Sequence, residues 1–564
     1  MSRLREEHWV AMSRLREEHW VAMSRLAMSR MHRVRGPQQM STESTATPTQ
    51  QIAAGYAVEG QALELGTVVV NGTADPAAQI RIPLATVNRH GLVAGATGTG
   101  KTKSLQVIAE QLSAAGVPVL MADVKGDLSG LSRPGVANDK TAQRAADTGD
   151  SWTPTAFPVE FLSLGTEGIG VPVRATITSF GPILLSKVLG LNATQESTLG
   201  LIFHWADQKG LPLLDLKDLR SVITFLTGDE GKPELKALGA VSPTTAGVIL
   251  RALVNLEAEG ADTFFGEPEL RPQDLMRVDA SGRGIITLLE LGNQAARPVM
   301  FSTFLMWVLA DLFTFLPEVG DVDKPKLVFF FDEAHLLFTD ASKAFLEQVE
   351  QTVKLIRSKG VGVFFCTQLP TDVPNDVLSQ LGARVQHALR AFTPDDQKAL
   401  NKTVRTYPKT EVYDLESALT SLGIGEAIVT VLSEKGAPTP VAWTKMRSPR
   451  SLMDTIGPEA ISAAAKGSPL QAEYGQTIDR DSAYERLMAK VAPPPPLPAA
   501  PADLPPVPSQ AEVPPMPAPA EPQGPGFLDK MMNNPAVKSA MRSAGTAFGR
   551  EITRSIFGTG RRRR

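Results

Sequence analysis

Apolar residues follow two patterns along this chain, short runs bounded by turn residues and longer stretches with helical spacing. The strands that the short runs predict lie at Leu92–Ala94, Val117–Ala122, Gly284–Leu289, Leu327–Phe331, Val361–Cys366 and Arg384–Arg390. Apolar positions three and four apart predict helices, among them Val299–Leu316 and Lys343–Ser358. Because strands alternate with helices, we expect an α/β fold built on a parallel, doubly wound sheet.

A mostly helical segment at residues 180–275 interrupts this alternation. One α/β core does not need so many residues between two neighbouring motifs, so we interpret the segment as an insertion. The core then consists of two parts, residues 90–179 and 276–460. Within the first part, residues 133–155 are polar and rich in turn formers, and we expect an exposed loop there.

The N-terminal residues carry an internal repeat. Met1–Ala11 recurs unchanged as Met12–Ala22, and each copy opens with methionine. A coiled-coil-like helix could carry such a repeat, but a tandem duplication or misplaced start of translation explains it more simply, with Met40 as a candidate start. We therefore expect residues 1–45 to be disordered or extraneous and keep them out of the fold. Residues 46–89 predict a small β element.

The C-terminal residues form three predicted segments. A helical extension covers residues 461–491, and a proline-rich stretch at 492–525 has the composition of a stiff linker. Residues 526–564 predict a basic amphipathic helix that ends in four arginines. Such a helix can dock its apolar face on the chain itself or on a neighbouring copy, or it can contact polyanions or an anionic membrane.

Composition sets few limits on function. The chain has 564 residues and a formal net charge of −3, so binding to nucleic acid would depend on local basic patches. The one cysteine, Cys366, excludes an internal disulfide framework and is expected to be buried. No apolar run has the length of a membrane span, and Phe301–Leu316, interrupted by Asp311, is expected to be a buried helix. These features favour a cytoplasmic protein.

The chemistry begins with a glycine-rich loop that follows the strand Leu92–Ala94. Its spacing, Gly-x4-Gly-Lys-Thr, is that of the phosphate-binding loop (Walker A), whose backbone N–H groups surround a phosphate. We expect Lys101 to contact the β- and γ-phosphates and Thr102 to ligate Mg²⁺. The nucleotide-binding residues are then Gly95, Ala96, Thr97, Gly98, Thr99, Gly100, Lys101, Thr102 and Lys103. The expected ligands are ATP and Mg²⁺.

A second motif follows the apolar strand Leu327–Phe331. Asp332 is a candidate Mg²⁺ ligand, and Glu333 is a candidate base for the attacking water (Walker B). His335 either belongs to the site or begins a helix beside it.

Polar residues after two other strands can complete the site. Gln368 follows the strand Val361–Cys366 and can contact the γ-phosphate or the water; the alternative is a polar residue that simply ends a strand. Asp123, Lys125 and Asp127 either support the site or stabilise their own loop.

With these motifs the sequence resembles the HerA/FtsK-type P-loop ATPases, specifically the bacterial HerA-like C-terminal-domain (YjgR-like) family. The stretches that carry the resemblance are Asn88–Thr102, Ala122–Gly130, Phe180–Ser186, Phe331–His335, Phe365–Pro370 and Gly549–Ile552. The resemblance implies a RecA-like P-loop NTPase core, a homo-oligomeric and usually hexameric ring, and ATP hydrolysis between subunits. Relatives that move double-stranded DNA make DNA a possible partner.

In such a ring an arginine of one subunit completes the site of its neighbour. Arg89 matches the family's arginine by position, and Arg384 and Arg390 are rivals; each can equally be a structural arginine. The chain departs from full HerA proteins because residues 46–89 leave little room for their N-terminal barrel domain. An ATP-driven oligomeric switch that acts on protein or membrane is therefore the alternative to a DNA motor.

Overall fold

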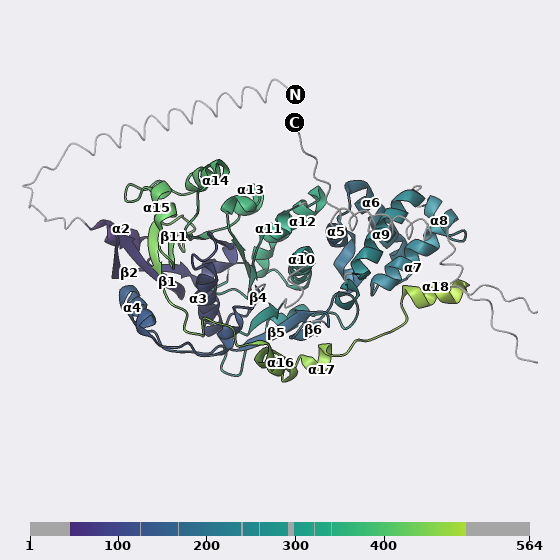
Figure 1. Cartoon of the computed structure of the whole chain (residues 1–564), viewed down its shortest axis with the longest axis horizontal. Coiled ribbons are helices and arrows are strands. Elements are labelled where there is room, and N and C mark those ends of the chain that lie inside the picture. Colours follow the sequence, from purple (N-terminus) through teal and green to yellow (C-terminus); the bar gives the residue numbers. More distant parts are fainter. Residues whose placement is uncertain are drawn as a thin grey trace, which may run out of the picture. The chain divides into compact units, whose positions relative to one another are not determined.

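A twelve-stranded sheet lies at the centre of the part of the chain that the structure, a computed structural model, describes (Figure 1). That part is residues 46–491 without 124–125, 167, 238–240, 259, 291–297, 321 and 340. Its strands are β1 Ala62–Val70, β2 Thr73–Pro83, β3 Gly91–Ala94, β4 Val119–Asp123, β5 Val159–Leu164, β6 Val171–Val173, β7 Ile286–Glu290, β8 Leu327–Phe331, β9 Val361–Thr367, β10 Ala383–Gln386, β11 Glu426–Thr430 and β12 Ala442–Met446.

The strand order is β2-β1-β12-β11-β10-β3-β9-β8-β4-β7-β5-β6. Neighbours from β10 to β6 are parallel, which confirms the expected α/β fold. The other strand pairs, from β10 to β2, are antiparallel. The β element expected within residues 46–89 is therefore the outer edge of the same sheet.

Side chains alternate between the two faces of the sheet. Phe330 and Phe364 stack in the core that includes α3, with ring centroids 5.2 Å apart. Phe331 and Phe365 stack at 5.3 Å in the core on the opposite face, which also includes the helical segment. Because both faces are covered by helices, the central strands consist almost entirely of apolar residues.

The helices are α2 Pro48–Ala54, α3 Lys101–Ala114, α4 Asp139–Thr148, α5 Ile177–Val188, α6 Ala193–Gln208, α7 Leu216–Thr227, α8 Lys232–Ala237, α9 Pro243–Ala258, α10 Pro298–Phe315, α11 His335–Phe338, α12 Lys343–Ile356, α13 Asn375–Leu378, α14 Pro394–Val404, α15 Leu415–Ser421, α16 Pro458–Lys466, α17 Gln471–Tyr474 and α18 Ala483–Val491. Helices α5–α9 occupy the segment expected to be helical, and they pack on one another and, through α5, on α10 and α12. Among the described residues no helix has the length and apolarity to cross a bilayer.

Two expectations were wrong. The polar stretch 133–155 contains helix α4, which begins with a capping box between Asn138 and Thr141. Half of the residues of α4 are exposed and only two are buried, so its sequence has little apolar periodicity. The strand expected at Arg384–Arg390 ends at Gln386, because the chain leaves the sheet where His387 packs beneath the phosphate-binding loop.

A C-terminal strap, residues 447–491, leaves β12 and runs beneath the sheet to the helical segment (Figure 1). It contacts β5 through α16, β6 through α17 and α7 through α18. Near its end, Ser482 and the backbone amide of Tyr484 both donate to the buried carboxylate of Asp218 in α7. The strap therefore joins the helical segment to the β5–β6 edge of the sheet.

Candidate functional site

The glycine-rich loop connects β3 directly to α3, so its backbone N–H groups lie at the N-terminus of a fourteen-residue helix. Gly98 has φ +80°, and a Cβ there would meet nothing within 4 Å, which leaves open space over the loop. Lys101 donates from Nζ to the carbonyl oxygens of Gly95 and Ala96. The ammonium group therefore lies against the loop, where a phosphate would replace these contacts.

A buried histidine supports the loop from below. The Nδ1–H of His387 donates to the carbonyl of Glu426 at 2.8 Å, and its Nε2 accepts from the Ser104 hydroxyl at 2.9 Å. Burial lowers the pKa of His387 to about 4, and nearby Lys101 acts in the same direction. A Cβ at Gly95 would lie 2.5 Å from Cβ of His387, so only glycine fits there. Sequence patterns gave no sign of this contact.

The acidic pair follows β8 as expected. The amide of Glu333 donates to Oδ1 of Asp332 at 2.9 Å, and Glu333 has φ +48°, an uncommon conformation for a residue other than glycine. His335 both begins α11 and lies near the site, because its Nδ1 is 3.4 Å from Oε2 of Glu333. Left-handed backbone often occurs where an active site fixes a side chain.

The two motifs meet on either side of β9. The amide of Gly95 donates to the carbonyl of Thr367 at 3.2 Å, and the amide of Ala334 donates to the carbonyl of Cys366 at 2.8 Å. The thiol of Cys366 is buried, as predicted. Its pKa is raised first by burial and then by Asp332, with a smaller increase from Glu333, while Lys101 lowers it. Residues of both motifs thus surround the same point.

The arrangement fits a nucleoside triphosphate with its metal. Phosphates can approach the open loop at Gly98, and Thr102 lies in the first turn of α3. Thr102 and Asp332 are the candidate Mg²⁺ ligands, both oxygen donors of the kind that Mg²⁺ prefers.

Gln368 is exposed at the end of β9, whereas Thr367 and Leu369 on either side of it are held by hydrogen bonds. The Thr367 hydroxyl and the Leu369 amide both donate to Asp372, at 2.6 and 3.0 Å. Gln368 and His335 line one cavity of about 430 Å³. Gln368 and His335 therefore lie together where the ends of β8 and β9 meet. Sequence reasoning missed Asp372.

Asp123 mainly stabilises its own loop. It accepts from the amides of Asp127 and Leu128, at 3.1 and 2.8 Å, while Lys125 lies outside the described residues. Asp123 is also the register partner of Glu290 on β7. Burial raises the pKa of Asp123 to about 6, with Asp127 adding to the increase, and burial together with Asp123 raises the pKa of Glu290 to about 8. Sequence reasoning missed Glu290.

The three candidate arginines separate into two places. Arg390 donates to the carbonyl of Thr97 in its own loop. Arg89 and Arg384 instead line a cavity of about 450 Å³, together with Lys354 and Arg357. No Asp or Glu is among the described residues that line this basic cavity.

The basic cavity lies at the amino ends of β3 and β10, because Arg89 precedes β3 and Arg384 is near the start of β10. Next to Arg89, His90 has φ +61° and is fully enclosed. Its Nε2–H donates to the carbonyl of Val353 at 2.8 Å, and its Nδ1 accepts from the amide of Val363 at 3.0 Å. Burial lowers the pKa of His90 to about 4. His90 thereby fixes the backbone that carries Arg89.

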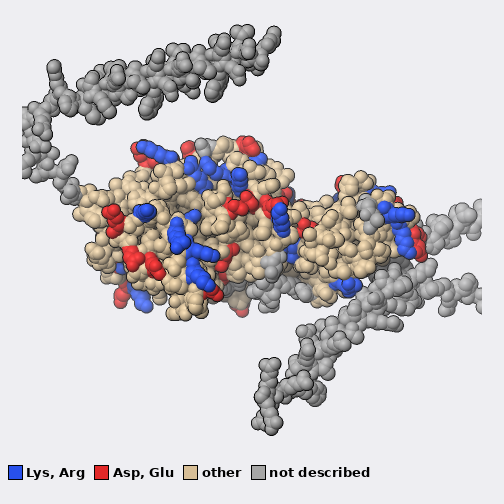
Figure 2. All heavy atoms as spheres, turned by 90° about the horizontal axis from the view of Figure 1, so that it is seen from above, with Lys and Arg blue, Asp and Glu red and all other residues tan. Residues whose placement is uncertain are grey.

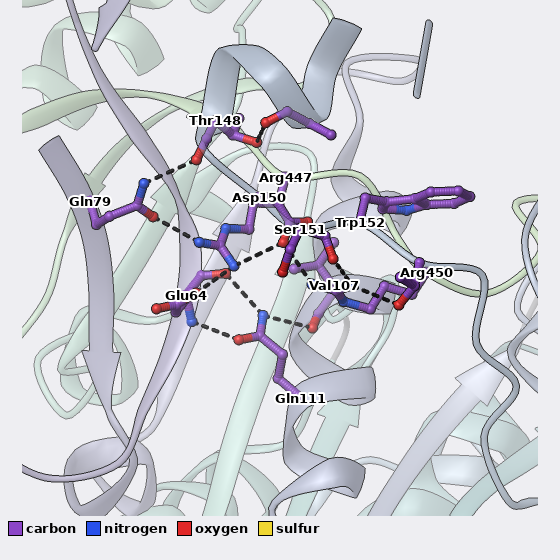
Figure 3. A network of polar contacts seen from close by, with 12 residues as sticks. Glu64, Gln79, Val107, Gln111, Thr148, Asp150, Ser151, Trp152, Arg447 and Arg450 are labelled. Atoms are coloured by element: carbon purple, nitrogen blue, oxygen red, sulfur yellow. Dashed lines mark hydrogen bonds and ion pairs between the residues drawn. The ribbon is translucent and has the colours of Figure 1, made fainter. Parts of the chain in front are cut away.

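The start of the strap holds α3 from outside (Figure 3). Asp150 accepts from Arg450 at 2.6 Å and from Arg447 at 3.4 Å, and Arg447 also donates to Gln79 on β2. Glu110 of α3 accepts from the amides of Arg450 and Ser451, at 2.8 and 3.0 Å. Strap, sheet edge and nucleotide-binding helix thus share one polar network.

The parallel sheet, the phosphate-binding loop and the acidic pair at the end of β8 together define a P-loop ATPase. The profile of the helicase HerA-like C-terminal family matches residues 69–564. The chain belongs to this family, as its motifs predicted.

Solved structures with a similar fold include the plasmid coupling protein TrwB in complex with ADP and Mg²⁺, which is 16% identical with a TM-score of 0.47. That match covers 72% of this chain and 94% of TrwB. VirB4 of Thermoanaerobacter pseudethanolicus is 15% identical with a TM-score of 0.44, over 69% of this chain and 97% of VirB4. No curated protein matches the chain.

Proposed function

We propose that the protein hydrolyses ATP at interfaces between copies of the chain and uses this hydrolysis to move along DNA. The observation that carries the proposal is the separation of the basic cavity from the phosphate-binding loop and acidic pair. The loop and acidic pair lie at the carboxyl ends of the parallel strands, and the basic cavity lies at their amino ends. The four residues of β3 span about 13 Å, which is longer than an arginine side chain. Arg89 therefore needs a second copy to reach a nucleotide.

Within one copy the residues have distinct tasks. The loop amides and Lys101 bind the phosphates, while Thr102 and Asp332 hold Mg²⁺, which neutralises charge on the phosphate oxygens when bound. Glu333 accepts a proton from the attacking water, and Gln368 orients that water. Arg390, which contacts Thr97, supports the loop in its own chain.

The neighbouring copy supplies the remaining positive charge. Arg89 is the first candidate and Arg384 the second, because both line the basic cavity. An arginine that stabilises the charge of the transition state in this way has a large effect on rate. Closed assemblies with such head-to-tail contacts are rings, and we propose a hexamer.

DNA is the proposed substrate because the chain belongs to the helicase HerA-like family. A switch that acts on protein or membrane is the second candidate. It is favoured by the net charge of −3 and by the face in Figure 2, where acidic and basic side chains are interspersed. Hydrolysis measured with duplex DNA, single-stranded DNA and no DNA distinguishes them. Stimulation by DNA that weakens with salt supports the motor, and an unchanged rate supports the switch.

A further inference from the structure

Two segments far apart in the sequence border the first turn of α3. The amide of Gly425 donates to the carbonyl of Thr99 at 3.0 Å. On the strap, the carbonyl of Met453 accepts from Nζ of Lys103 at 2.9 Å. Both segments therefore lie next to the end of α3 at which phosphates bind.

Each segment carries an exposed apolar side chain next to these contacts. Ile424 is 76% exposed and Met453 is 38% exposed. Single exposed apolar residues need no explanation, but two that gather around a ligand-binding turn match the composition of small-molecule sites.

Ile424 is exposed although hydrogen bonds fix the backbone around it. Arg144 donates to the carbonyls of Ile424 and Gly425, at 3.1 and 3.0 Å, and to that of Met446 at 3.3 Å. The Met453 segment is fixed as well, because Gln106 of α3 donates to the neighbouring carbonyl of Leu452 at 2.9 Å. The backbone that carries both apolar side chains is therefore fixed before any ligand arrives, which lowers the entropic cost of binding.

We infer that Ile424 and Met453 form the nucleoside subsite, where they contact the base and ribose of the bound nucleotide. This inference rests on the proposed nucleotide binding at the loop. The carbonyls of Ile424, Gly425 and Met453 already accept from Arg144 and Lys103, so apolar contact carries the recognition. Apolar contact distinguishes bases weakly, and adenine and guanine nucleotides bind with affinities within about threefold of each other.

The test measures equilibrium binding of ATP, GTP and inorganic tripolyphosphate to the full chain by calorimetry. The double variant Ile424→Ala/Met453→Ala is expected to bind ATP about tenfold more weakly. It should bind tripolyphosphate like the parent, because the phosphate contacts remain. The matched control is Ile478→Ala, a 56% exposed isoleucine elsewhere on the strap, which should leave both affinities unchanged.

The outcomes separate the subsite from the proposed function. Unchanged ATP affinity in the double variant overturns the subsite, as does an equal loss for ATP and tripolyphosphate. A parent chain that binds ATP without hydrolysing it overturns the proposed function and leaves the subsite standing. A parent chain that binds tripolyphosphate as tightly as ATP also overturns the subsite. Thermal unfolding of each variant checks that the fold is intact.

Discussion

Arg390 donates a hydrogen bond of 3.2 Å from Nη2 to the carbonyl oxygen of Thr97, in the phosphate-binding loop of its own chain. This contact separates Arg390 from Arg89 and Arg384, which lie at the opposite ends of the same strands. The three arginines therefore differ in which copy of the chain they would serve.

Mixing experiments test this difference. Arg89→Ala should reduce ATP hydrolysis by about 10³-fold, since a transition-state charge is lost. Mixing it with Lys101→Ala subunits should restore part of the activity, because some loops with Lys101 then face an intact Arg89. Arg390→Ala mixed with Lys101→Ala is the matched control. It should restore nothing, because each change damages the loop of the copy that carries it and no intact loop remains. Full activity of a strictly monomeric protein would contradict the interface mechanism.

Lys101 and Glu333 should separate binding from hydrolysis. Lys101→Ala is expected to weaken ATP binding at least about 100-fold, because it removes the ammonium that faces the phosphates. Glu333→Gln should keep ATP bound and slow hydrolysis by about 10²–10⁴-fold, because an amide cannot accept the proton of the water. Calorimetry and phosphate release measure the two effects. Turnover by Glu333→Gln at the parent rate would remove Glu333 from the mechanism.

Glu290 should make stability depend on pH. Its pKa in the folded protein is about 8, against 4.5 without burial, so the folded state holds a proton that the unfolded state releases. The stability that this carboxyl contributes is complete below pH 4.5 and is lost as pH rises to 8. Glu290→Gln should therefore be about 3 kcal/mol more stable than the parent at pH 8.5 and similar to it at pH 5.

Urea unfolding at the two pH values measures this effect. Glu459→Gln, which changes an exposed carboxyl on α16, is the matched control. Equal stability of Glu290→Gln and the parent at pH 8.5 would show that the charged Glu290 carboxylate is stabilised in the folded protein and does not destabilise it.

The end of the strap should contribute to stability through Asp218. Asp218→Ala removes the acceptor for the amides of Leu214 and Tyr484, and it leaves the Ser482 hydroxyl with Glu485 as its remaining partner. We expect a loss of about 3 kcal/mol in the free energy of unfolding and faster proteolysis within the strap. Asp207→Ala, an exposed position on α6, provides the control. Equal proteolysis of both variants would mean that α18 is held by its apolar contacts alone.

The tail gives a fifth prediction, although residues 492–564 lie outside the described part of the chain. We propose that residues 526–564 dock on the ATPase core of the same or a neighbouring copy. Deleting them should alter oligomer size or the ATPase rate at constant salt. An unchanged rate and size, with a salt-sensitive loss of binding to DNA or liposomes, would instead identify an electrostatic tether.

Local patterns predicted the core of the site but not what surrounds it. The loop and the acidic pair depend on residues within a few positions, so their spacing identifies them. Contacts such as Ser104 with His387, or Asp123 with Glu290, join residues that only the folded sheet brings together. Helix α4 was not predicted because its polar residues show no helical spacing of apolar positions.

The strap also determines when the site can be completed. Ser451 meets Glu110 across 341 positions of the chain, and Ser482 meets Asp218 across 264. During translation, α3 and the helical segment leave the ribosome long before these partners exist. The buried carboxylate of Glu110 gains its hydrogen bonds from the Arg450 and Ser451 amides only when the strap has been made, whereas Asp218 already accepts from the amides of Leu214 and Asp215. The nascent chain therefore carries a complete phosphate-binding sequence long before it gains a finished nucleotide site.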